Sequence, residues 1–215
     1  MMKRVSRLSR KKKLIARSGM ALAACAGLYF GALAVFTKGI DRLPDRPCEG
    51  AVERETIADI LPAARTAEER SRLDDDHGID SREFLFHCSV LTSDGSLLSG
   101  DAESGDRSVE DWSSGWVESP DSSSGVTGDI TAFATDGAAA IYVSCAPPGR
   151  SESKSPKSRA LIVEASTLGE TKAQGADLQQ DLVDFAYELA EHAYKVGECP
   201  GPRKFPDQSP RLHSP

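Results

Sequence analysis

Twenty consecutive residues without a charge, residues 18–37, constrain this chain more than any other feature of its sequence. They are mostly Ala, Leu, Gly, Phe and Val, and as an α-helix they would be about 30 Å long, the thickness of the hydrocarbon core of a bilayer. A run of this length and composition is typical of a transmembrane helix. We therefore expect residues 18–37 to anchor the chain in a membrane.

The charges on the two sides of this run indicate its orientation. Residues 1–40 carry nine Lys and Arg and no acid, and eight of these bases precede Ser18. From Asp41 onward the chain carries 17 bases and 33 acids. By the positive-inside rule, residues 1–17 form a basic cytoplasmic tail and the large acidic part lies outside the cell. We expect no nucleic-acid partner, because no aromatic or folded nucleic-acid-binding module accompanies the tail.

Two other interpretations of the apolar run stay open. Ala32-Leu33-Ala34 has the small-x-small pattern of a signal-peptidase site, but the run continues without a polar region. Leu22-Ala23-Ala24-Cys25 resembles a lipobox, although only seven residues separate Arg17 from Cys25. All three interpretations export residues 48–199. If the run is retained as a helix, Gly27 and Gly31 form a GxxxG pair through which the chain could form a homodimer.

Cysteine usage supports export independently. Apart from Cys25 the chain has four cysteines, distributed across the acidic part: Cys48, Cys88, Cys145 and Cys199. No pair has CxxC spacing and no His lies at metal-ligand spacing, so disulfides are expected rather than a metal site. Of the three possible pairings we favour Cys48 with Cys88 and Cys145 with Cys199, because each ties a helical element to a strand beside it in sequence.

The hydrophobic pattern of the acidic part predicts one α+β domain over residues 48–199, with an antiparallel sheet of about five strands packed by a long C-terminal helix. The predicted strands are residues 83–91, a returning strand with Leu97 and Leu98, 130–135, 138–145 and 160–164. The predicted helical segments are residues 56–61, a turn that begins at the capping box of Thr66 and Glu69, 108–112 and 176–196. Residues 38–47 are expected to form a stalk, residues 119–125 a Ser-rich loop, and residues 200–215, with five prolines, a disordered tail.

The last helix has the clearest periodicity. Its apolar residues recur every three or four positions along one stripe: Leu178, Leu182, Phe185, Leu189, Ala193 and Val196. Tyr187 and Tyr194 lie one heptad apart on another side of the same helix. Two interpretations of these tyrosines stay open: residues 51–73 cover them, or they form a candidate interface for a partner.

The arrangement resembles that of uncharacterised exported, membrane-anchored proteins of actinobacteria. The resemblance depends on the basic tail, the apolar span and the cysteine segments Pro47-Cys48-Glu49-Gly50, Phe86-His87-Cys88-Ser89-Val90 and Ile141-Tyr142-Val143-Ser144-Cys145, with a further cysteine after the final helix. It implies a location in the cell membrane with the C-terminal domain outside. It implies no activity, cofactor or site residue.

No residue pattern predicts a catalytic, cofactor or metal site. Asp74, Asp75 and Asp76 do not continue as a calcium-binding loop, and no GxSxG elbow is present. His87 is expected on the strand face opposite Cys88. Trp112 and Trp116 are expected to pack on the sheet, with an aromatic pair that faces a ligand as the alternative. The sequence thus favours an exterior domain that binds an envelope protein or a cell-wall component. An enzyme that acts on envelope polymers and a signalling partner that uses its cytoplasmic arm are the alternatives.

Overall fold

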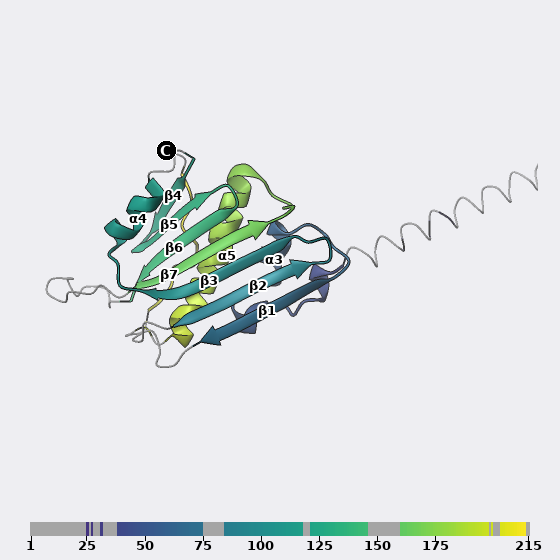
Figure 1. Ribbon diagram of the computed structural model, residues 1–215, viewed down its shortest axis with the longest axis horizontal. Helices are drawn as coiled ribbons and strands as arrows, with labels where there is room; N and C mark the ends of the chain where they lie inside the picture. Colours follow the sequence, from purple (N-terminus) through teal and green to yellow (C-terminus); the bar gives the residue numbers. More distant parts are fainter. Residues whose placement is uncertain are drawn as a thin grey trace, which may run out of the picture.

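The computed structural model describes residues 25, 27, 31, 38–74, 84–117, 121–145, 160–197, 199 and 203–213. Its centre is a seven-stranded antiparallel sheet in the order β1-β2-β3-β7-β6-β5-β4, with the long helix α5 across one face (Figure 1). The predicted α+β class, antiparallel sheet and C-terminal helix are confirmed, and the sheet has seven strands rather than about five. The strands are β1 (Ala67–Asp74), β2 (Leu85–Thr92), β3 (Leu97–Gly105), β4 (Ser123–Thr127), β5 (Ile130–Thr135), β6 (Ala138–Ser144) and β7 (Ala160–Leu168).

The two strands that the pattern did not predict form the two edges of the sheet. β1 replaces the helical turn expected at Thr66, and the Glu69 carboxylate accepts a hydrogen bond from the Cys48 amide at 2.5 Å instead of capping a helix. β4 begins at Ser123, within the expected Ser-rich loop. Both strands are polar or short, as edge strands often are, so neither shows an apolar alternation.

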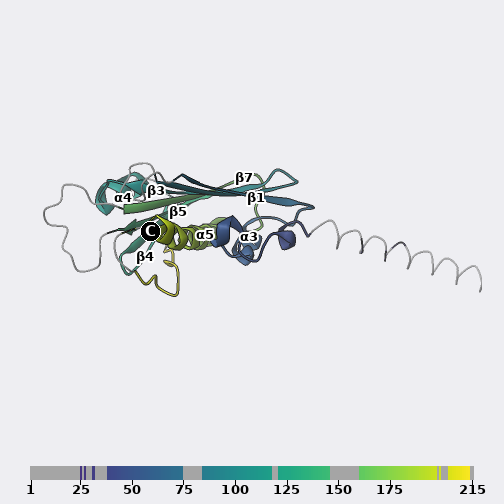
Figure 2. The same ribbon diagram turned by 90° about the horizontal axis from the view of Figure 1, so that it is seen from below.

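The helical elements lie mainly on one face of the sheet (Figure 2). On this face are η1 (Ile40–Arg42), the turn α2 (Pro47–Gly50), α3 (Arg54–Ile60) and α5 (Gly175–Val196). The predicted stripe of α5 packs on the sheet, and Leu182, Phe185 and Leu189 have no solvent exposure. A shorter helix, α4 (Val109–Val117), packs on the opposite face near β5. The main core therefore lies between the sheet and α5.

Residues 38–47 are not a separate stalk. Ile40 and Leu43 are only 5% and 6% exposed, and the Gly39 amide donates a 2.8 Å hydrogen bond to the Ala64 carbonyl. The prediction of a stalk is wrong because these two apolar residues pack into the main core. Most of the predicted span, residues 18–37, lies outside the described residues. Of the helices that the structure does describe, none is both long and apolar enough to cross a membrane.

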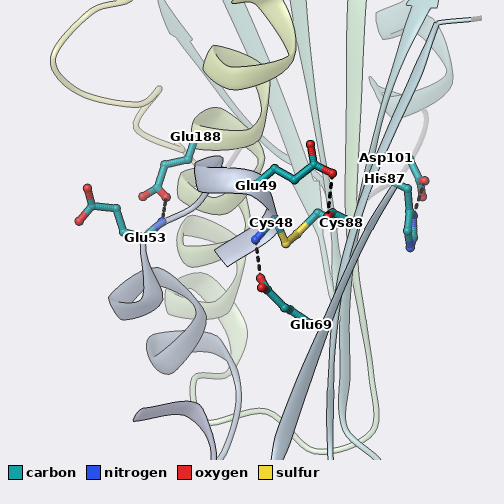
Figure 3. Close-up of a disulfide and its surroundings, with 9 residues drawn as sticks. Cys48, Glu49, Glu53, Glu69, His87, Cys88, Asp101 and Glu188 are labelled. Carbon is teal, nitrogen blue, oxygen red and sulfur yellow. Dashed lines mark hydrogen bonds and ion pairs between the residues drawn. A yellow bond between two sulfur atoms is a disulfide. The ribbon is translucent and has the colours of Figure 1, made fainter. Parts of the chain in front are cut away.

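Both disulfides are present with the favoured pairing. Cys48 is bonded to Cys88 and Cys145 to Cys199. The first bond joins α2 to β2 across the main core (Figure 3), where Cys48 and Glu49 have the left-handed φ values of 57° and 59°. The second joins the residue after β6 to the segment that follows α5. Cys25 is exposed and not part of a disulfide.

Residues 203–213 pack against α5, so the prediction of a disordered tail is wrong for them. Phe205 is 8% exposed, and the Leu212 amide donates a 3.1 Å hydrogen bond to Gln180. The segment ends beside β4, where the backbones of His213 and Ser124 form a β-bridge. The proline content of the segment does not prevent order here, because α5 and the sheet edge supply partners for it. We call residues 203–213 the C-terminal strap.

Candidate interaction surface

None of the described helices packs on one face of the sheet over β1, β2, β3 and β7, opposite the face that α5 covers (Figure 1). Along each strand the residues that point to α5 are mostly buried and those between them point outward, as the burial pattern of β2 shows clearly. The register aligns these outward residues in rows across the four strands. We call them the open face: Glu68, Arg70, Arg72, Asp74, Leu85, His87, Ser89, Leu91, Leu97, Ser99, Asp101, Glu103, Glu164, Ser166 and Leu168.

The central row of the open face carries charge. Arg72, His87, Asp101 and Glu164 are consecutive cross-strand neighbours. The Nδ1 atom of His87 lies 2.7 Å from a carboxylate oxygen of Asp101, and the two side chains are 33% and 50% exposed. Figure 3 shows this pair on the far side of the sheet from the Cys48–Cys88 disulfide, the side that the strand pattern predicted for His87.

A row of serines lies next to the charged row. Ser89, Ser99 and Ser166 are opposite one another in β2, β3 and β7, and the hydroxyls of Ser99 and Ser166 lie 3.1 Å apart. Ser99 therefore bonds to Ser166 rather than to His87. Because the His87–Asp101 pair is solvent-exposed and has no hydrogen-bonded serine in the described contacts, this arrangement suits surface binding better than nucleophilic catalysis.

The other part of this face is closed by α4. Trp112 is 5% exposed and its ring centroid lies 5.6 Å from that of Phe133 and 5.4 Å from that of Tyr142. Trp116 stacks on Phe133 at 6.4 Å. Both tryptophans thus pack on the sheet, as the sequence predicted. The open face begins where this aromatic cluster ends.

Tyr187 and Tyr194 do not form a free interface. They are 7% and 6% exposed, and the Phe205 ring lies edge-on to both, with centroids 5.7 and 5.5 Å away. The Tyr187 hydroxyl donates a 2.6 Å hydrogen bond to the Pro206 carbonyl. Burial raises the pKa of Tyr187 to about 12. The cover comes from the C-terminal strap rather than from residues 51–73, because the strap supplies the aromatic ring that fits between the two tyrosines.

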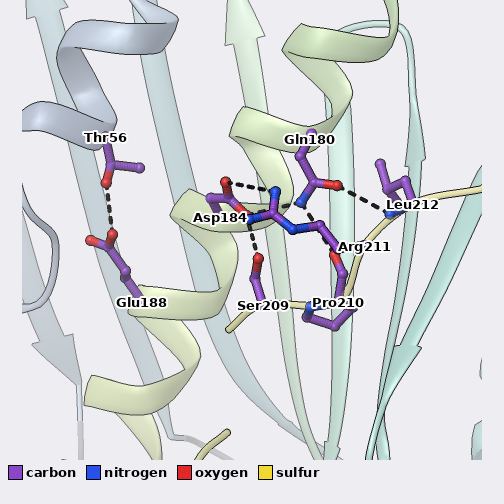
Figure 4. Close-up of polar contacts among 8 residues, drawn as sticks. All are labelled: Thr56, Gln180, Asp184, Glu188, Ser209, Pro210, Arg211 and Leu212. Carbon is purple, nitrogen blue, oxygen red and sulfur yellow. Dashed lines mark hydrogen bonds and ion pairs between the residues drawn. The ribbon is translucent and has the colours of Figure 1, made fainter. Parts of the chain in front are cut away.

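Polar contacts along α5 hold the strap in place (Figure 4). Asp184 accepts a hydrogen bond from Ser209, and the Gln180 amide donates to the Pro210 carbonyl at 3.2 Å. A cavity of about 570 Å³ lies between α5 and the strap. Its lining mixes acids with bases, namely Asp184, Glu188, Glu191, Asp207, Arg203, Lys204 and Arg211. A lining of both signs does not select one class of charged ligand.

Glu188 and His192 are ionisable side chains of α5 that are partly desolvated. Burial raises the pKa of Glu188, although its carboxylate accepts hydrogen bonds from the Thr56 hydroxyl at 2.7 Å and the Glu53 amide at 2.6 Å. Burial lowers the pKa of His192, whose ring centroid lies 4.9 Å from that of Phe86. The Nε2 atom of His192 is buried and has no hydrogen-bond partner among the described residues.

No cluster of metal ligands occurs in the part of the chain that the structure describes. Of Asp74, Asp75 and Asp76, only Asp74 lies within the described residues. No protein-family model, curated protein or solved structure matches this chain. The resemblance to exported actinobacterial proteins therefore stays a prediction.

Sequence reasoning found the outward residues of β2 and missed the rest of the open face. The alternation around Cys88 placed His87 outward, but its partner Asp101 was not predicted. β1 was missed, although every second residue from Glu68 to Asp74 is charged. Phe205 is the one aromatic residue after Cys199, and this was the available signal that the strap packs on the domain.

Proposed function

We propose that this chain is a single-pass protein of the cell envelope, anchored by residues 18–37 with its basic tail in the cytoplasm, and that its exterior domain binds a partner through the open face. The two disulfides support the exterior location, because such bonds persist in oxidising compartments. The open face carries the binding proposal, because it is a surface of the sheet on which none of the described helices packs.

The charges of the open face favour a basic partner. The face has five acids and two arginines, and the acids include the neighbouring Asp101, Glu103 and Glu164. Complementary charge increases the rate of encounter and suppresses wrong partners. A positively charged protein surface or cell-wall segment is therefore the partner that this face suits.

The size of the open face favours a transient complex. Four strands about 4.8 Å apart and seven residues of about 3.4 Å each give a projected area of about 450 Å². A standard stable interface buries about 800 Å² on each partner. We therefore expect weak, salt-sensitive binding rather than a permanent complex.

Neutralising the acids of the open face should test the proposal. A soluble form that begins at Lys38 should cosediment with isolated cell envelopes at low salt and be released at high salt. The triple variant Asp101→Asn, Glu103→Gln and Glu164→Gln should lose about tenfold in this binding, because it removes three charges without changing shape.

A matched control removes three exposed acids from the helix side of the domain. The triple variant Glu55→Gln, Asp177→Asn and Asp207→Asn has the same change in net charge and should cosediment like the unaltered protein. Equal losses in both triple variants would mean that net charge, not the open face, determines binding. For location, protease added to intact cells should degrade residues 48–199, and protection of these residues would contradict the exterior assignment.

A further inference from the structure

Several segments of the domain meet at one end of the sheet, the end where β1 begins and β2 and β7 end (Figure 1). The Gly39 amide donates to the Ala64 carbonyl at 2.8 Å, and the Ser93 amide donates to the Thr66 carbonyl at 2.9 Å. The turn before β3 also packs here on the turn after β7, since a Cβ at Gly169 would lie 3.1 Å from the Ser96 Cα atom. We call this the Gly39 end of the domain.

Only a very short segment connects the predicted span to the domain at this end. The apolar run stops at Thr37, and Ile40 is already in the main core, so only Lys38 and Gly39 lie between. Three Cα–Cα steps separate Thr37 from Ile40, a distance of at most about 11 Å. The backbone at Gly39 also packs tightly against that of Ala64, because a Cβ at Gly39 would lie 2.7 Å from the Ala64 carbonyl oxygen. A membrane span that ends at Thr37 would therefore hold the Gly39 end at the lipid surface.

Over β2, β3 and β7 the open face is apolar at this same end, while Glu68 of β1 continues the row at the sheet edge. Leu91 lies opposite Leu97, and Leu97 lies opposite Leu168, so three leucines form one row across β2, β3 and β7. Leu91 is 41% exposed and Leu168 is 69% exposed. The next rows are the serines and then the charged residues. Over β2, β3 and β7 these first three rows thus change from apolar to polar with distance from the Gly39 end.

We propose that the Gly39 end of the domain docks on the outer lipid surface, with Leu91, Leu97 and Leu168 in the headgroup region. This inference depends on the proposed membrane anchor. Apolar side chains at an interface enter the headgroup region by about 5–10 Å, which suits a single row of leucines. Exposed charges of both signs lie nearby, including Lys38, Asp94 and Glu170, so the contact depends on apolar burial and should persist at high salt.

Val126 provides a control position far from the Gly39 end. Val126 lies in the same cross-strand row as Ile162, six residues along β7 from Leu168. Six residues of a strand span about 20 Å, so Val126 would be held well above the lipid. Its exposure, 65%, is close to that of Leu168. The pair therefore provides a label position and a matched control.

The test uses the full chain with Cys25→Ser, reconstituted in vesicles of phosphatidylcholine and phosphatidylglycerol. A nitroxide is attached at Leu168→Cys or, as the control, at Val126→Cys. Electron paramagnetic resonance then measures collisions with oxygen, which dissolves in lipid, and with a water-soluble nickel chelate. Docking predicts that the label at position 168 loses access to the chelate and gains access to oxygen, at low and at high salt, whereas the label at position 126 stays aqueous.

The outcomes separate docking from anchoring. If alkaline carbonate extracts the chain from the vesicles, the anchor proposal is wrong, and the docking proposal that depends on it is wrong as well. If the chain stays in the membrane but the label at position 168 is as accessible to the chelate as the label at position 126, docking alone is wrong. A label at position 168 that is immobilised without access to oxygen would indicate a protein contact, including one with a second copy, and would also overturn lipid docking.

Discussion

His192 and Glu188 couple the stability of the domain to pH in opposite directions. Burial lowers the pKa of His192, so the unfolded chain binds a proton there more readily than the folded chain. The contribution of His192 to the free energy of unfolding is complete above the ordinary histidine pKa of about 6.5 and is lost as pH falls below it. Burial raises the pKa of Glu188, so the folded chain holds that proton more tightly and loses stability as pH rises through the raised pKa. Between pH 7.5 and 5.5, acidification therefore lowers the free energy of unfolding through His192 and not through Glu188.

Replacing His192 with Leu should therefore reduce the loss of stability at mild acid pH. The unaltered protein should lose free energy of unfolding between pH 7.5 and 5.5, with His192 contributing less than about 1.4 kcal/mol per pH unit. Glu49 favours the protonated ring and reduces this effect, whereas Lys195 and Arg46 oppose protonation and add to the effect of burial. Urea unfolding at the two pH values measures the change.

The control for this prediction is His213→Leu, because the His213 side chain is exposed and the residue joins β4 only through its backbone. This variant should show the same loss on acidification as the unaltered protein. An equal loss in His192→Leu would mean that His192 does not contribute to the pH dependence.

Secondary structure was predictable where local pattern and tertiary environment agree. The long helix α5 and the β5–β6 hairpin follow directly from a 3.6-residue apolar period and from the Asp136-Gly137 turn. β1 was not predictable in the same way, because its inward positions include Glu69 and Ser71, which bond to the α2 turn instead of entering an apolar core. The open face could be predicted only for β2, since its rows arise from the register of four strands.

The C-terminal strap depends on a tertiary contact that no local pattern encodes. A Pro-rich segment with one aromatic residue has the composition of a disordered tail. It becomes part of the domain because Phe205 completes a cluster with Tyr187 and Tyr194, and because Arg203 forms an ion pair with Asp129. The side chain of Phe205 is therefore the main apolar attachment of this element.

We expect Phe205→Ala to release the strap without unfolding the domain. Burial of a Phe side chain contributes about 2 kcal/mol, so the backbone amides of Leu212 and His213 should exchange with solvent about 30-fold faster. Hydrogen exchange followed by mass spectrometry measures this locally. Lys204→Ala is the control, because Lys204 is exposed and should leave exchange unchanged. Faster exchange throughout β7 and α5 would show instead that the strap is required for the whole fold.

Over the whole molecule, the two disulfides join the helical layer to the sheet at separate places. Cys48–Cys88 ties the N-terminal helical segment to β2, and Cys145–Cys199 ties the segment after α5 to the end of β6. The strap begins only four residues after Cys199, so the second bond also limits how far the strap can move. The two bonds should therefore contribute similarly to the free energy of unfolding of the domain, but only the second should restrict motion of the strap.

Removing either disulfide should lower the free energy of unfolding by about 4 kcal/mol, because the closed loops of 40 and 54 residues are similar in length. The double variants Cys48→Ser with Cys88→Ser and Cys145→Ser with Cys199→Ser serve as controls for each other in urea unfolding. Only the second should also speed hydrogen exchange at Leu212 and His213. Before unfolding, alkylation of the non-reduced full chain should modify Cys25 alone, and peptide mapping should find Cys48 joined to Cys88. Alkylation at any of the other four cysteines, or equal acceleration of strap exchange in both double variants, would contradict this assignment.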